Sequence, residues 1–120
     1  MSHVVSIKTQ VRDSVAVASA CARLNLPAPV HRKIRLFTAE ETGLAVELPG
    51  WRYPVVCQTE TGKLKFDNFG GRWGEQKQLD RFLQLYAVEM VKLQARRQGQ
   101  IAIEQPLADG SIRIQIAITA

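Results

Sequence analysis

The residues that catalyse hydrolysis or hold a metal ion are few in this chain and widely spaced. Its imidazoles are His3 and His31, and a hydrolytic triad or a metal site would need one of them to converge with a nucleophile or with carboxylates. His31 falls in the polar register of a strand beside Lys33 and Arg35, where repulsion between like charges favours a neutral, solvated ring. We therefore predict no catalytic residue, no metal site and no cofactor.

The two cysteines lack the spacing of a reactive or metal-binding pair. Cys21 lies among alanines in a helix-like segment, and Cys57 follows two valines in a strand-like segment. They form no Cys-x-x-Cys motif and have no histidine nearby in the sequence. A thiol in such a setting packs as a small apolar group, so we expect both cysteines to be reduced and inert.

The most unusual composition is that of residues 67–74, Asp-Asn-Phe-Gly-Gly-Arg-Trp-Gly. Phe69, Arg72 and Trp73 could present flat rings and a planar cation to a ligand or a partner. The segment lacks the lysine of a phosphate-binding loop and the glycine spacing of a dinucleotide site. The alternative for Trp73 is packing, because a large aromatic residue ahead of a helix often folds back over the core.

The charge balance permits binding to a polyanion without requiring it. Sixteen lysines and arginines stand against eleven acidic residues, giving a net charge of +5. Five basic residues are predicted on neighbouring strands and could form one basic sheet face: His31, Lys33, Arg35, Lys63 and Lys65. A solvated sheet face explains the same residues equally well.

Length and composition indicate the kind of domain that must position these residues. The chain has 120 residues, of which 46% are hydrophobic and 22% charged, which is typical of one globular domain spanning 1–120 with one core. No stretch approaches the length of a membrane-spanning helix, and the N-terminus lacks the pattern of a secretory signal. We expect a cytoplasmic protein with no membrane partner.

Periodicity predicts an α+β domain in the order β-α-β-β-β-β-α-β-β, with two helices packed on one face of an antiparallel sheet. Asp13 is placed to cap the first helix. Glycine-containing separators, including 40–43 and 108–110, predict the turns. The expected strands are 5–11, 30–36, 44–48, 53–59, 63–67, 101–103 and 112–118, and the expected helices are 14–24 and 75–97.

The second helix is apolar over more than half its circumference. Its core stripe is predicted to comprise Leu79, Phe82, Leu83, Tyr86, Met90 and Leu93. Leu85, Val88 and Val91 fall outside this stripe. Either the helix is sandwiched within the chain, or these three residues contact a protein partner.

Both ends of the chain resemble a known family. The quoted motifs are Met1-Ser2-His3, residues 7–13 (Ile-Lys-Thr-Gln-Val-Arg-Asp), Gln84-x-Tyr86-Ala87, 95–99 (Ala-Arg-Arg-Gln-Gly), Glu104-Gln105 and 109–114 (Asp-Gly-Ser-Ile-Arg-Ile). They resemble the proteins called hypothetical chloroplast reading frame thirty-five, found in algal plastids, cyanobacteria and other bacteria. The middle of the chain departs from that pattern.

The resemblance implies kinship and no transferable activity. Relatives are often encoded beside an AAA-type ATPase, which implies a non-enzymatic accessory role. We therefore expect a non-catalytic adaptor domain that binds another protein, with an AAA-type ATPase as the implied partner. The alternative is a nucleic-acid-binding module that uses the basic face with Phe69, Arg72 and Trp73. The sequence leaves the oligomeric state open.

Overall fold

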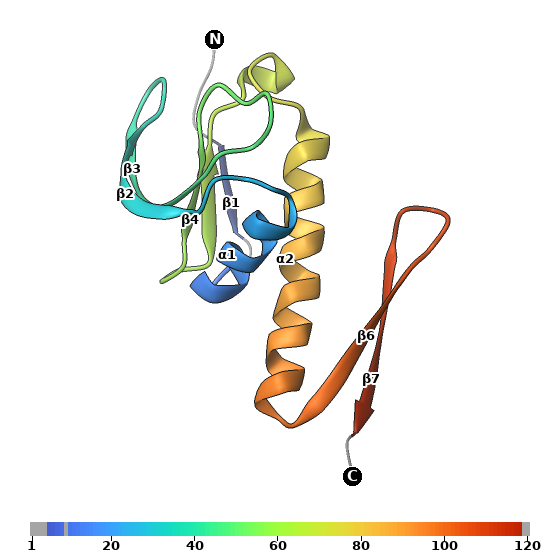
Figure 1. The fold of residues 1–120 in the computed structure, drawn as a ribbon. Helices are drawn as coiled ribbons and strands as arrows, with labels where there is room; N and C mark the ends of the chain where they lie inside the picture. Colours follow the sequence, from blue (N-terminus) through green and yellow to red (C-terminus); the bar gives the residue numbers. More distant parts are fainter. Residues whose placement is uncertain (1–4, 9, 119–120) are drawn as a thin grey trace.

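Two helices and two antiparallel sheets make up the fold (Figure 1). The structure, a computed structural model, describes residues 5–8 and 10–118, with side chains from 10 to 117. The α+β class and the predicted element order are confirmed, while His3 lies outside the described residues. The elements are β1 (Val5–Lys8), α1 (Ser14–Arg23), β2 (Val30–Arg35), β3 (Glu40–Val46), β4 (Val55–Gln58), β5 (Lys63–Phe66), the 3-10 turn η1 (Phe69–Gly71), α2 (Gln76–Arg97), β6 (Gln100–Pro106) and β7 (Ile112–Ile118).

Helix α1 begins where the sequence predicts it. The Asp13 carboxylate accepts hydrogen bonds from the amides of Val15 (2.9 Å) and Ala16 (3.1 Å), which satisfies two of the amides that a helix start leaves unpaired. The Tyr86 hydroxyl of α2 accepts from the amides of Arg12 (3.1 Å) and Asp13 (3.2 Å). The entry to α1 is thereby tied to the middle of α2.

The larger sheet has the strand order β1-β5-β4-β3-β2, and both helices cover one of its faces. Alternation along the strands sends successive side chains to opposite faces, so the sheet carries a core on each side. The helix-covered core includes Val17, Cys21, Val46, Val55, Cys57, Leu64, Phe66, Leu79, Phe82 and Leu85, and the smaller core on the other face comprises Ile34, Leu36, Ala45 and Val56, with Tyr53 against it.

The predicted turn at 40–43 is wrong, because these residues belong to β3. Strands β2 and β3 are joined instead by Phe37 and Thr38, closed by a bond from the Leu36 amide to the Ala39 carbonyl (2.8 Å). Gly43 serves a close approach between strands: a Cβ there would lie 2.7 Å from the carbonyl oxygen of Cys57. The glycine that suggests a turn therefore has a packing role within β3.

Helix α2 continues past the larger sheet, and the last two strands pair only with each other. With 22 residues it is roughly 33 Å long at 1.5 Å per residue, which carries the chain away from the larger sheet before β6 begins. Hairpin β6–β7 then runs back beside α2, where the Gln84 side chain donates to the Gly110 carbonyl (2.8 Å). The predicted hairpin is confirmed, but as a separate sheet.

An ion cluster formed by Arg23, Glu89, Lys92 and Glu104 joins α1, α2 and β6. Arg23 donates from both terminal nitrogens to the Glu104 carboxylate, at 2.6 and 2.5 Å, and to Glu89 at 3.1 Å. Lys92 lies 3.1 Å from Glu104 and 3.5 Å from Glu89. The hairpin is thus held to both helices by paired charges.

The burial of Leu85 and Val88 contradicts the prediction that this side of α2 contacts a protein partner. Leu85 is 1% exposed and Val88 is 4% exposed, while Val91 is half-buried. Helix α2 packs against α1 and against hairpin β6–β7 as well as the sheet. Because these elements surround the helix within one chain, Leu85 and Val88 are part of the core.

Candidate partner-binding surface

Residues 67–74 form a tight turn that begins directly after β5. The Asn68 carbonyl accepts from the amides of Gly71 (3.0 Å) and Trp73 (2.9 Å), and the Asn68 side chain donates to the Gly74 carbonyl (3.3 Å). Gly70 and Gly71 both have positive φ, as the turn requires. This turn places Phe69 and Trp73 on the same side of the loop, where their rings stack.

Two features of this turn are locally unfavourable. Phe69 has a φ of 48°, and the only other described non-glycine residue with positive φ is Asn25, a type that tolerates this conformation far better. Asp67 is fully buried; its Oδ1 accepts from the Phe69 amide (3.3 Å), but its Oδ2 has no hydrogen-bond partner among the described residues. Such features persist only where the surroundings impose them, and they concentrate at functional sites.

Trp73 is the centre of an aromatic group drawn from three segments of the chain. Phe69 stacks on it with ring centroids 4.7 Å apart. Phe37, from the β2–β3 turn, and Tyr53, from the β3–β4 loop, meet it edge-on at 5.1 and 5.7 Å. These are the distances at which ring pairs attract beyond simple burial.

Two arginines complete this group. The guanidinium carbon of Arg52 lies 4.7 Å from the Trp73 ring centroid and 5.5 Å from that of Tyr53, and that of Arg72 lies 5.3 Å from the centre of Phe69. Neither arginine forms an ion pair with any described carboxylate. We call these residues the aromatic–arginine cluster: Phe37, Arg52, Tyr53, Phe69, Arg72 and Trp73.

Hydrogen bonds and ring contacts hold the backbone beneath the aromatic–arginine cluster in place. The Arg52 amide donates to the Trp73 carbonyl (2.8 Å), which joins the β3–β4 loop to the turn before α2. Trp51 donates from its indole nitrogen to the Glu75 carbonyl (3.1 Å) and packs edge-on against Phe66. Its ring packs against Gly74, where a Cβ would clash with the indole. The cluster is therefore fixed relative to the first turn of α2.

The three loop residues predicted as a site are brought together, and three further residues join them. Phe69 and Trp73 are half-buried and Arg72 is exposed, so the turn both packs and presents surface. Phe37 is 53% exposed. The sequence signal for Phe37 and Tyr53 is weak, because an aromatic residue next to a strand is usually a core residue. Arg52 carries no signal of its own, because a single arginine in a loop is usually a solvated surface residue.

The predicted basic face is divided by the strand register. Arg32 and Lys65 lie on the same face of the sheet. Arg32 pairs with Gly43, which shares a face with Ala45 two residues on, and Ala45 is linked to Lys65 through Val56. His31, Lys33 and Arg35 alternate with Arg32 and therefore point to the opposite face, and two strands separate β2 from β5. The prediction that His31, Lys33, Arg35, Lys63 and Lys65 share one face is wrong.

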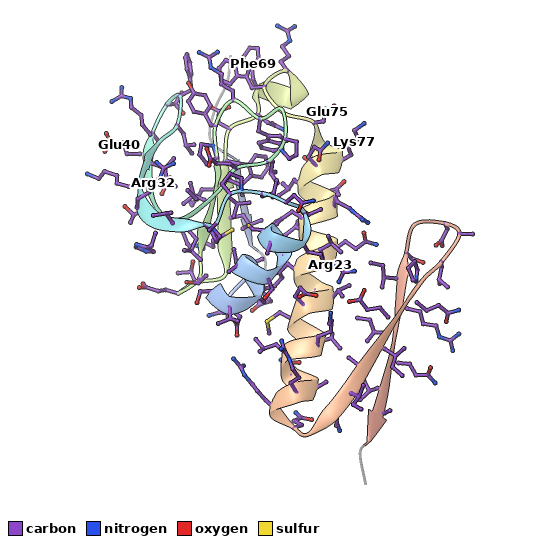
Figure 2. All side chains as sticks on the ribbon, viewed as in Figure 1. Arg23, Arg32, Glu40, Phe69, Glu75 and Lys77 are labelled. Atoms are coloured by element: carbon purple, nitrogen blue, oxygen red, sulfur yellow. The ribbon has the colours of Figure 1, made fainter. Side chains whose placement is uncertain are left out.

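Several of these cations are also paired with carboxylates. Lys33 and Arg35 both lie near Glu40, at 3.4 and 3.7 Å, and Lys65 lies 4.0 Å from Glu41. Figure 2 shows Glu40 and Arg32 on the β2–β3 hairpin. The basic residues do not form one continuous surface.

The side chain of His31 makes no hydrogen bond or ion pair with the described residues. It lines a shallow, open cavity of about 460 Å³ together with Thr42, Gly43 and residues 58–61. Within the described ranges no three histidine, cysteine or acidic side chains gather as a metal site would require. No described helix is long and apolar enough to cross a membrane.

Both cysteines are buried and unpaired. Burial raises the pKa of Cys21 to about 11, and burial together with the nearby Cys21 raises the pKa of Cys57 to about 12. Since the thiolate is the reactive form, both side chains are poor nucleophiles at neutral pH.

No family model, curated protein or solved structure matches the chain. The resemblance to hypothetical chloroplast reading frame thirty-five therefore stays a prediction that rests on the motifs at the two ends of the sequence.

Proposed function

We propose that the chain is a non-catalytic adaptor domain that binds another protein through the aromatic–arginine cluster. The observation that carries this proposal is the presence of two exposed arginines that lie on aromatic rings and have no carboxylate partner among the described residues. Tryptophan, tyrosine and arginine are the residue types that dominate binding energy at protein interfaces.

The strain in the turn supports a binding role. A phenylalanine at positive φ and a buried, unpartnered carboxylate oxygen both lower stability. Glycine at position 69 would relieve the backbone strain, but it would remove the ring that stacks on Trp73. Retaining the ring keeps an aromatic surface beside Arg72, where a partner would meet it.

The partner surface that fits the cluster carries carboxylates beside apolar groups. A carboxylate can accept two parallel hydrogen bonds from a guanidinium, and the exposed ring of Phe37 offers apolar area on the same tryptophan that Arg52 covers. The resemblance of the chain ends implies an AAA-type ATPase as the protein to try first. Nucleic acid is less well supported, because the register divides the basic residues that would neutralise phosphates.

The experiment is a binding titration between the purified chain and an AAA-type ATPase of the source organism. Phe37→Ala tests the cluster, and Val30→Ala is the matched control, since the two residues are 53% and 57% exposed and it is Phe37 whose ring meets Trp73. Truncating an interface anchor costs about 2 kcal/mol, or roughly a thirtyfold loss of affinity. We expect that loss for Phe37→Ala and none for Val30→Ala.

Three results would count against the proposal. They are no binding to the ATPase, equal losses for both variants, and a preference for single-stranded RNA that weakens steeply with salt and depends on Arg72. The last would favour the nucleic-acid alternative.

A further inference from the structure

Strand β7 has an open edge. The smaller sheet contains only β6 and β7, and β6 is the strand that packs along α2, whereas β7 touches the helix far less. Figure 1 shows the hairpin on the side of α2 away from the larger sheet. Within the part of the chain that the structure describes, no strand pairs with the outer edge of β7.

The hairpin turn determines which backbone groups face that edge. The Leu107 amide donates to the Ser111 carbonyl (2.9 Å), and the Gly110 amide donates to the Leu107 carbonyl (3.1 Å). Because paired and unpaired positions alternate along an antiparallel ladder, Arg113 and Gln115 bond to β6. The amides and carbonyls of Ile112, Ile114 and Ile116 then point outward, without a strand partner.

The sequence of β7 does nothing to block this edge. It reads Ile-Arg-Ile-Gln-Ile-Ala-Ile, with no proline or glycine and with Arg113 as its only charge. Strand β6 carries Glu104 and Pro106, two residue types that natural proteins place on exposed edges to prevent pairing. A long isoleucine-rich edge with one charge and no proline is open to another strand.

We propose that β7 pairs antiparallel with β7 of a second copy of the chain, centred on Gln115, to give a four-stranded sheet β6-β7-β7-β6. In this register Ile114 lies opposite Ile116 of the second copy, so apolar side chains meet on one face. Arg113 lies opposite Ala117, so like charges never face each other.

The exposure of the strand and the small size of its sheet support this pairing. Ile116 is 43% exposed, and a second β7 would cover it with isoleucine. Helix α2 covers one face of this two-stranded sheet, and a second β7 would extend the sheet to four strands and enlarge its apolar face. Pairing therefore gives hydrogen-bond partners to the outward amides and carbonyls of β7 and extends the two-stranded sheet to four strands.

The register can be tested by disulfide capture in the full chain. A twofold axis at Gln115 puts its Cα about 4.5 Å from its own copy, within the range that a disulfide spans. Gln115→Cys is the test variant, and Arg113→Cys is the matched control on the same face of the same strand. The native Cys21 and Cys57 are buried and do not compete.

We expect sedimentation velocity to show a dimer of the parent chain and mild oxidation to link Gln115→Cys roughly tenfold faster than Arg113→Cys, because only the former pair lies within disulfide range. Mixed Arg113→Cys and Ala117→Cys chains should also link. Ile103→Lys, on β6 and therefore one strand away from the pairing edge, should remain dimeric. A parent chain that stays monomeric at high concentration, equal linking of the two single variants, or loss of the dimer in Ile103→Lys would each overturn the proposal.

Discussion

The molecule uses arginine in two opposite ways. In the ion cluster, the fork of Arg23 holds both oxygens of Glu104 and also reaches Glu89. In the aromatic–arginine cluster, Arg52 and Arg72 lie over rings and pair with no described carboxylate. Figure 2 shows the two regions apart, with Phe69 at one end and Arg23 beside the helices. A neutralised arginine joins elements, whereas an unpaired arginine on a ring stays available to a partner.

The largest expected effect is a loss of stability on replacing Trp73, the packed centre of the aromatic–arginine cluster. Trp73→Ala removes the ring that Phe37, Tyr53 and Phe69 all contact. We expect the free energy of unfolding to fall by about 3 kcal/mol, the lower end for truncating a packed tryptophan, since the ring is half-buried. Urea unfolding measures this loss. An unchanged midpoint would show that the rings do not pack together in solution.

Arg23→Ala tests the structural role of the paired arginine in the ion cluster. It leaves Glu89 and Glu104 with Lys92 as their shared cation, so we expect a loss of about 2 kcal/mol, typical of bonds to charged groups. Arg81→Ala is the control, because among the described residues the side chain of this exposed arginine on α2 bonds only to the neutral side chain of Gln84. Equal thermal midpoints for the two variants would mean that the ion cluster does not stabilise the fold.

The ion cluster also predicts a dependence on pH. Hydrogen bonds from Arg23, with smaller effects from Lys92, lower the pKa of Glu104 from 4.5 to about 2. A lowered pKa stabilises the fold fully above the unfolded value, so this contribution should disappear as the pH falls from about 4.5 to about 2. Glu104→Gln should remove that component in the same window. Parallel pH profiles for the two proteins would contradict the assignment.

The smallest expected change in stability is that of Arg72→Ala. Its guanidinium lies on Phe69 at the surface and has no ion pair with a described residue, so we expect a loss of at most about 0.5 kcal/mol. If the partner carries a carboxylate there, affinity should fall while the thermal midpoint stays constant. If Arg72→Ala destabilised the fold as much as Arg23→Ala, then Arg72 would also hold the structure together and the contrast between the two arginines would be wrong.

Local signals in the sequence were sufficient for the helices and for most strands. Asp13 caps α1 as its position predicts, and α2 follows its apolar stripe, because both depend on residues within a few positions of each other. The burial of Leu85 and Val88 could not be predicted in this way. It depends on where hairpin β6–β7 packs, which is a contact between elements.

The candidate site could be predicted only in part for the same reason. Phe69, Arg72 and Trp73 adjoin one another in the sequence, so their proximity was evident. Phe37 joins them only because the β2–β3 turn falls at residues 37 and 38, and the Phe-Thr pair has none of the usual turn residues. The prediction of one basic face was wrong because it depends on strand register and strand order, which periodicity does not specify.

The position of hairpin β6–β7 along α2 has a consequence for avidity. The aromatic–arginine cluster lies at the start of α2, and the hairpin packs beside its later turns. A dimer joined through β7 would therefore carry two clusters, each at a distance from the pairing strands and each free to engage its own site. Against a partner with repeated subunits, the second contact would form at a high effective concentration, so two weak sites would together bind tightly.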